Sequence, residues 1–323
     1  MSFPKLQKHE NLRRVKLLDL SARIRRFRAT NLSQLNGEQV YNRIGKIADG
    51  YMTRPALIGA NGVFRARVNS GDEFFRNSSE LWYPPSEKVQ AGRFNLAHQS
   101  KFYASNSPIA AIWEIRPKVG DFVTVLYAAT FSPTDEIALT HVGLHEFNGA
   151  PELDIANLRE SISFIHMLKA NGVEKKWMII DDLFSEYSNK IVNVQNATDV
   201  YKVTNAMDKL FSGVPRSGTL YPSIASSNNF YNICISPDDA DRYFFPGLAW
   251  VVEIVDWHEH QEGFPPSPQG YFQIAIRAET SPISIAGNLN WFKRHENVSP
   301  DVMQFAIAKV GELRKRYSAV QKS

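Results

Sequence analysis

The order of strand and helix patterns along the chain is the feature that most limits the folds open to it. The clearest predicted strand is DFVTVLYAATF at residues 121–131, which is rich in β-branched and aromatic residues. Further strand patterns lie at residues 62–68, 101–105, 230–236, 247–257 and 271–279. Helical patterns lie between strands, at residues 151–172, 179–189 and 197–213. Because these helices cluster instead of alternating with strands, the sequence predicts a mixed α+β fold and not a doubly wound sheet.

Three consecutive segments are expected along the chain. Residues 1–60 form a basic N-terminal extension and connector, with a short helix near residues 37–48. Residues 61–240 form the core, in which a mixed sheet carries the helical patterns as an insert. Residues 241–323 add C-terminal strands and a closing helix, for which Ser299 is a good N-cap and Pro300 a favoured first residue. The core therefore has helical extensions at both ends.

Length and cysteine content limit the cellular setting. The chain has 323 residues and a single cysteine, Cys234, which excludes an internal disulfide and is expected to be buried in the apolar run FYNICIS. No run approaches the roughly 18 apolar residues that span a bilayer. The N-terminus lacks the apolar segment and cleavage site of a signal peptide. We therefore expect a soluble cytoplasmic protein with no membrane partner.

Positive charge is concentrated at the N-terminus. Residues 1–28 contain nine Lys or Arg against Glu10 and Asp19, a balance of +7 that leaves −3 for the rest of a chain whose formal net charge is +4. Leu12, Val15, Leu18 and Phe27 give this segment an apolar helical stripe, so it can dock on the body or on a partner. A solvated basic helix and a contact with nucleic acid or an acidic partner both stay open.

Several familiar sites are missing from the sequence. The Gly-rich dinucleotide fingerprint, the phosphate-binding loop and the G-x-S-x-G elbow are all absent, which argues against those nucleotide sites and a standard serine hydrolase. His141 and His145 stand four apart, and His258 and His260 two apart, but neither pair has an evident third ligand. No metal site is predicted.

Five short motifs place polar residues beside turns or at element ends. They are FRAR at 64–67, AGRFN at 91–95, KFYAS at 101–105, AAIWEI at 110–115 and LYPSIASSNNFYNICISP at 220–237. Ser107 and Pro108 predict the start of a short helix that carries Glu114 among apolar neighbours. Each of these polar residues alone is typical of a surface or a turn.

The ordered set resembles the RES domain family, which includes the toxins of RES–Xre toxin–antitoxin pairs. The resemblance covers roughly residues 60–240. It implies a fold similar to ADP-ribosyltransferases. It also implies a site to which the matching positions contribute Arg65, Gly92, Arg93, Asn95, Tyr103, Glu114 and Ser223, with Phe94 where the family usually has tryptophan.

The resemblance implies an enzyme that consumes NAD by splitting its nicotinamide–ribose bond, with water or inorganic phosphate as acceptor and no resident cofactor. Glu114, Arg65 and Ser223 would be catalytic. Arg65, Arg93, Tyr103, Asn95 and Ser223 would bind NAD. A neutralising protein of the Xre type is an implied partner. An ADP-ribosyltransferase that modifies a macromolecule, and a non-catalytic module that binds nucleic acid or protein, remain alternatives.

The residue types suit this chemistry. Nicotinamide leaves as a neutral molecule, so the reaction needs no general acid, unlike an ordinary glycoside hydrolysis that uses two carboxylates. One carboxylate, Glu114, can hydrogen-bond the ribose and stabilise the developing cation. Guanidinium groups such as those of Arg65 and Arg93 suit a diphosphate better than lysine does.

Overall fold

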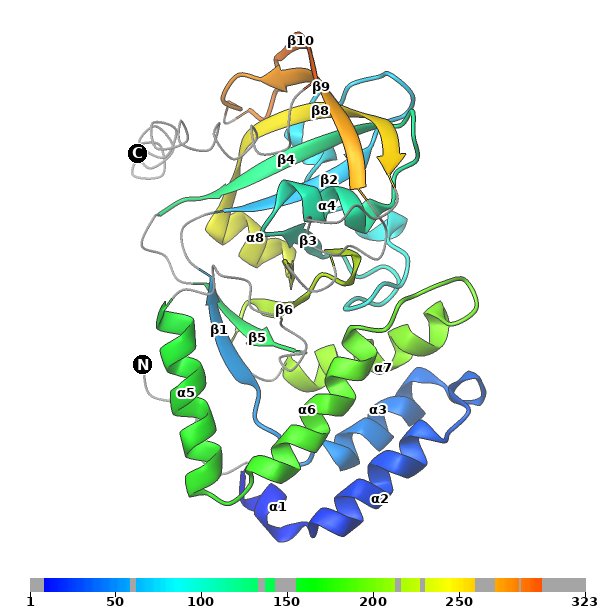
Figure 1. The fold of residues 1–323 in the computed structure, drawn as a ribbon, viewed down its shortest axis with the longest axis vertical. Coiled ribbons are helices and arrows are strands. Elements are labelled where there is room, and N and C mark those ends of the chain that lie inside the picture. Colours follow the sequence, from blue (N-terminus) through cyan, green and yellow to red (C-terminus); the bar gives the residue numbers. More distant parts are fainter. Residues whose placement is uncertain are drawn as a thin grey trace. The chain divides into compact units, whose positions relative to one another are not determined.

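The computed structural model describes residues 9–58, 62–132, 137–142, 155–212, 216–226, 230–258, 271–284 and 286–297. The chain forms two compact units, each built from segments that are not consecutive in sequence. Unit 1 comprises residues 1–57, 90–99 and 138–222, and unit 2 comprises residues 58–89, 100–137 and 223–323. Strands and helices occur in both, so the predicted mixed α+β class is confirmed (Figure 1).

Unit 1 is mainly helical. Its helices are α1 (His9–Arg14), α2 (Leu17–Arg28), α3 (Gly37–Ile47), α5 (Ile155–Ala170), α6 (Glu174–Ser188) and α7 (Ala197–Phe211), with the 3₁₀ turn η1 (Leu32–Gln34). Its strands are β1 (Arg54–Ile58), β5 (Ile137–His141) and β6 (Gly218–Pro222), which lie side by side in that order. β5 and β6 are parallel, with Thr140 opposite Thr219. None of the described helices is both long and apolar enough to cross a membrane.

The core of unit 1 joins the N-terminal helices to the helices of the middle segment. Leu20, Ile24 and Phe27 of α2 are buried in one apolar cluster with Trp177 and Phe184 of α6. The segment predicted as a basic extension is therefore part of a core, and only its outer face is basic. Leu18, which we expected on the apolar stripe, is instead 81% exposed.

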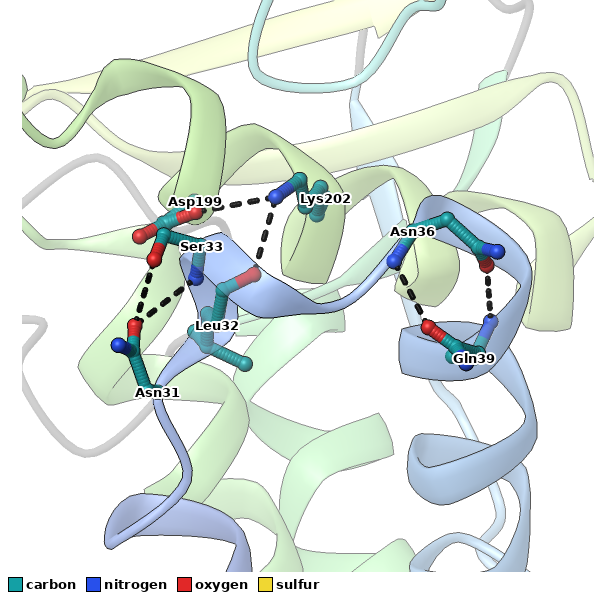
Figure 2. Close-up of polar contacts among 7 residues, drawn as sticks. All are labelled: Asn31, Leu32, Ser33, Asn36, Gln39, Asp199 and Lys202. Atoms are coloured by element: carbon teal, nitrogen blue, oxygen red, sulfur yellow. Dashed lines mark hydrogen bonds and ion pairs between the residues drawn. The ribbon is translucent and has the colours of Figure 1, made fainter.

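Side-chain caps fix where α3 begins. Asn36 accepts a hydrogen bond from the Gln39 backbone N–H at 2.9 Å, and the Asn36 backbone N–H donates to Gln39 Oε1 at 3.0 Å. This reciprocal pair satisfies two backbone donors that the first helical turn leaves unpaired. Lys202 Nζ of α7 donates to the Leu32 carbonyl and pairs with Asp199, which ties η1 to α7 (Figure 2).

Unit 2 is built around a sheet. Its strands are β2 (Val63–Val68), β3 (Phe102–Ser105), β4 (Phe122–Thr130), β7 (Tyr231–Ile235), β8 (Phe244–His258), β9 (Tyr271–Thr280) and β10 (Trp291–Asn297). They lie in the order β7-β3-β2-β4-β8-β9-β10, and each neighbouring pair is antiparallel. The helices are α4 (Pro108–Ile115) and α8 (Pro237–Tyr243), with 3₁₀ turns η2 (Ser78–Glu80), η3 (Ser86–Lys88) and η5 (Ile224–Ser226).

The two faces of this sheet carry different side chains. Phe64, Val125 and Tyr127 pack in one cluster with Ala111 and Ile112 of α4. Leu126, one residue along β4, packs in a second cluster with Leu81 and Ile283. Since successive strand residues point to opposite faces, α4 covers the face of Phe64 and Tyr127 and leaves the face of Leu126 to the second cluster.

Most predicted elements are present, and the structure adds strands that were not predicted, among them β1, β5 and β10. Gly218–Pro222 was not among the predicted strands either, yet it forms β6. Ser107 takes the extended N-cap position of α4, but its side chain makes no capping hydrogen bond. Cys234 is buried in β7, as expected. The predicted closing helix at residues 299–318, His145 and His260 lie outside the described residues.

Candidate functional site

α4 presents Glu114 beside the sheet of unit 2. Pro108 is the first residue of the helix, where its fixed φ is favourable, and the helix ends at Arg116 in the left-handed conformation (φ 49°, ψ 58°). Ala111 and Ile112 bury one side of the helix against Phe64. Glu114 is two residues after Ile112, so its side chain leaves the helix on a different side, and the residue is exposed.

Two buried side chains hold one oxygen of the Glu114 carboxylate. Ser223 Oγ donates to Glu114 Oε1 at 2.7 Å, and Asn232 Nδ2 donates to the same oxygen at 2.7 Å. Ser223 is 0% exposed and Asn232 is 3% exposed. Hydrogen bonds to an ionised carboxylate are short and strong, so these donors fix where the charge lies. Among the described residues, no hydrogen bond reaches Oε2.

Each of the two donors is itself held by its surroundings. Asn232 Oδ1 accepts a hydrogen bond from Ser105 Oγ, and Ser105 lies directly opposite Asn232 in the β3–β7 pair. This bond orients the amide so that its NH₂ group faces Glu114. The backbone N–H of Ser223 donates to the Phe230 carbonyl at 2.8 Å, which closes the turn between β6 and β7.

Strand alternation separates Tyr103 from Arg65. Tyr103 is two residues before Ser105 on β3, so the two side chains share a face of the sheet, the face from which Asn232 reaches Glu114. Arg65 follows Phe64 on β2 and lies opposite Leu126, so it starts from the other face. The structure therefore places Tyr103 on the side of Glu114, and Arg65 on the side of the second cluster.

The guanidinium of Arg65 contacts backbone carbonyls. Its Nε donates to the Leu81 carbonyl at 3.0 Å and its Nη1 donates to the Tyr103 carbonyl at 2.8 Å. The group also lies 5.9 Å from the centre of the Phe102 ring. Burial lowers the pKa of Arg65 to about 10, which still leaves the side chain charged at neutral pH. These contacts anchor β3, the strand that carries Tyr103 and Ser105.

Arg93 and Asn95 belong to unit 1. Arg93 Nη1 donates to the carbonyls of Tyr187 and Ser188 at 3.1 and 2.7 Å, and Nη2 donates to Lys190 at 3.0 Å, so Arg93 caps the end of α6. Asn95 is buried, and its Nδ2 donates to the carbonyls of Gln90 and Leu96. Both side chains stabilise the loop that contains them.

The structure thus brings Glu114 and Ser223 into direct contact and adds two residues that the sequence analysis did not select, Asn232 and Ser105. Asn232 interrupts the apolar run FYNICIS, and a buried amide in such a strand requires hydrogen-bonding partners. The need for such partners is the feature of the sequence from which Asn232 could have been selected. Ser105 offers no comparable signal, because a serine near a strand end is common.

The arrangement presents an anchored negative charge on an exposed helix residue. Such a carboxylate can accept hydrogen bonds from ligand hydroxyls or stabilise a positive charge that develops beside it. Within the part of the chain that the structure describes, no three His, Cys, Asp or Glu side chains lie close enough together to hold a metal ion.

No protein-family model matches the chain. No curated protein matches it either. The interpretation of the site therefore depends on its geometry and on the motifs of the sequence.

Proposed function

We propose that this protein cleaves the nicotinamide–ribose bond of NAD, with Glu114 as the catalytic carboxylate. The observation that carries this proposal is the carboxylate itself, exposed on α4 and held through Oε1 by the buried donors Ser223 and Asn232. A single fixed carboxylate is what this bond cleavage requires, since nicotinamide departs neutral. Glycoside hydrolysis in general needs two.

In this proposal Glu114 accepts a hydrogen bond from a ribose hydroxyl and stabilises the oxocarbenium-like cation as the bond to nicotinamide breaks. Water or inorganic phosphate then attacks the sugar carbon, releasing ADP-ribose or its phosphorylated form. Ser223 and Asn232 hold the carboxylate in place. Tyr103, on the same side of the sheet, offers an aromatic ring or a hydroxyl to the nicotinamide riboside. Arg65 acts indirectly, by anchoring β3 through the Tyr103 carbonyl.

The finer features of the fold and the partner belong to the same proposal. The mixed sheet with an attached helical segment is compatible with an ADP-ribosyltransferase-like fold of the RES type. An enzyme that depletes NAD harms the cell that makes it, so a neutralising protein, such as one of the Xre type, is the expected partner. These statements depend on the motif resemblance together with the Glu114 geometry.

The test is nicotinamide release from NAD by the purified protein, with and without inorganic phosphate. Replacing Glu114 by Gln keeps the side-chain shape and removes the charge, and we expect release to fall by about 10²–10³-fold. The matched control is Glu87→Gln, an exposed glutamate of η3, which should leave release unchanged. Folded protein that releases no nicotinamide under either condition would overturn the proposal. ADP-ribose recovered on a protein or nucleic acid would instead indicate a transferase.

A further inference from the structure

On α2, exposed positive charges outnumber the one exposed carboxylate, Asp19, and none of them forms an ion pair with it among the described residues. Leu20, Ile24 and Phe27 are buried, so the opposite side of the helix faces solvent. Arg25 and Arg26 lie on that side and are exposed. Lys16, just before the helix, and Arg13, near the end of α1, are exposed as well. We call Arg13, Lys16, Arg25 and Arg26 the basic face.

The other arginines nearby are already engaged. Arg14 pairs with Glu10 at 3.7 Å, Arg28 pairs with Glu186 at 2.7 Å, and Arg23 donates to the Lys46 carbonyl at 3.2 Å. In contrast, no ion pair joins any side chain of the basic face to a carboxylate among the described residues. Arg25 and Arg26 lie in the last turns of α2, and Lys16 and Arg13 lie before its first turn, about 14 Å or more away along the axis. A long polyanion that contacts both groups is attracted to each of them.

These four cations stand on a scaffold that is already ordered. The apolar side of α2 is part of the core of unit 1, and Lys176 Nζ of α6 donates to the carbonyls of Leu12 and Arg13 at 3.0 and 2.9 Å. The backbone of the basic face is therefore fixed before any ligand arrives. Binding a partner therefore does not require the entropy cost of ordering a disordered segment of this chain.

The composition of the face distinguishes between polyanions. The only Phe, Tyr or Trp between residues 9 and 28 is Phe27, which is buried, so none of these large rings is available there to stack on unpaired bases. Leu17 and Leu18 are the large apolar residues exposed there, too little apolar surface for a membrane or the core of a protein interface. In contrast, the regularly spaced phosphates of a nucleic-acid duplex can be bound by positive charge alone.

We propose that the basic face of α1 and α2 binds the phosphate backbone of duplex DNA without reading its sequence. Arg25 and Arg26 contact phosphates on one side of the helix, and Lys16 and Arg13 extend the contact toward its N-terminal end. This inference does not depend on the proposed NAD chemistry, because the face shares no residue with the Glu114 site.

The test is fluorescence anisotropy of the full chain with a labelled duplex of about 20 base pairs at salt concentrations from about 50 to 200 mM. Four phosphate contacts predict that log K falls against log salt with a slope of roughly −3 to −4, a loss on the order of 100-fold over this range. The double variant Arg25→Gln/Arg26→Gln, in which glutamine keeps helix propensity, should bring the slope about 2 units closer to zero. Removing residues 1–28 is not a suitable test, because it would also remove Leu20, Ile24 and Phe27 from the core.

The matched control is Lys88→Gln/Lys118→Gln, which removes two exposed charges from unit 2. Its slope should equal that of the unaltered protein. Equal losses in the two double variants would overturn the proposal, since binding would then follow net charge alone. Equal or tighter binding to single-stranded RNA or to anionic vesicles would also overturn it.

Discussion

At the scale of single residues, both hydrogen bonds to Glu114 fall on the same oxygen. Oε1 accepts from Ser223 and from Asn232, and Ser105 orients the Asn232 amide. The carboxylate is thus positioned by two different segments, the turn after β6 and the strand β7. If one of the two donors is lost, the other still holds the Glu114 carboxylate near its position, but over a wider range of orientations.

Replacing Asn232 by Asp tests this positioning in the proposed reaction. The substitution puts a second carboxylate next to Glu114 Oε1. A like charge disfavours ionisation, so the pKa of the pair rises and the acidic limb of the pH–activity profile moves to higher pH. Measuring kcat for nicotinamide release across pH gives the shift directly.

Asn232→Ala is the control for that shift, because it removes the same donor without adding charge. It should lower kcat by about 10-fold through looser positioning and move the acidic limb less than Asn232→Asp does, because the lost hydrogen bond disfavours ionisation but no like charge is added. A limb that moves equally in both variants, or in neither, would contradict a direct contact between residue 232 and the catalytic carboxylate.

The sequence anticipates only part of this site. Motif order selects Glu114, Ser223 and Tyr103, which lie on one side of the unit 2 sheet. The same reasoning groups Arg65 with them, but strand alternation directs Arg65 to the opposite face. The motifs carried no information about strand pairing, and pairing decides which side chains meet.

At the scale of elements, α2 illustrates how one helix can have two roles. Leu20 is 1% exposed and Leu18 is 81% exposed, although they are two residues apart in the same helix. Leu20→Ala should lower the free energy of unfolding by about 2–5 kcal/mol, because it leaves a cavity in the core of unit 1. Leu18→Ala should change it by less than about 0.5 kcal/mol.

Urea denaturation of the two variants measures this difference with residue type and helix held constant. If Leu20→Ala unfolded at the same urea concentration as the unaltered protein, α2 would be an appendage and not a part of the core. Near-equal destabilisation by Leu18→Ala would indicate that Leu18 is covered in solution.

Elements with strong local patterns were predictable, and those that depend on neighbours were not. β4 has β-branched and aromatic residues along its length, and it was assigned correctly. β6 has glycine at its start and proline at its end, which indicates a loop by local preference. Pairing with β5, with Thr140 opposite Thr219, makes this segment a strand.

At the scale of the whole molecule, each unit gathers distant segments. Residues 1–57, 90–99 and 138–222 build unit 1, and its buried cluster includes Leu20 from the first segment and Trp177 from the last. Helical periodicity shows that each helix has an apolar side. It does not show which apolar sides pack together, so the linear order of the elements could not reveal this assembly.

Burial of His141 within unit 1 makes the stability of the fold depend on pH. The side chain is 1% exposed, and burial, with a smaller effect of the nearby Arg54 charge, lowers the pKa of His141 well below its usual value. Below a pH of about 6.5 the unfolded chain binds a proton at this residue and the folded chain does not. The free energy of unfolding contributed by His141 is therefore fully present above that pH and is lost as pH falls, by up to about 1.4 kcal/mol per pH unit.

Urea denaturation between about pH 7.5 and 5 should show a weaker pH dependence of the free energy of unfolding in His141→Gln than in the unaltered protein, whatever the stability of the variant at neutral pH. His166→Gln, at an exposed position of α5, is the matched control and should keep the original slope. Equal slopes in all three proteins would mean that His141 binds its proton equally in the folded and unfolded chains, contrary to its burial.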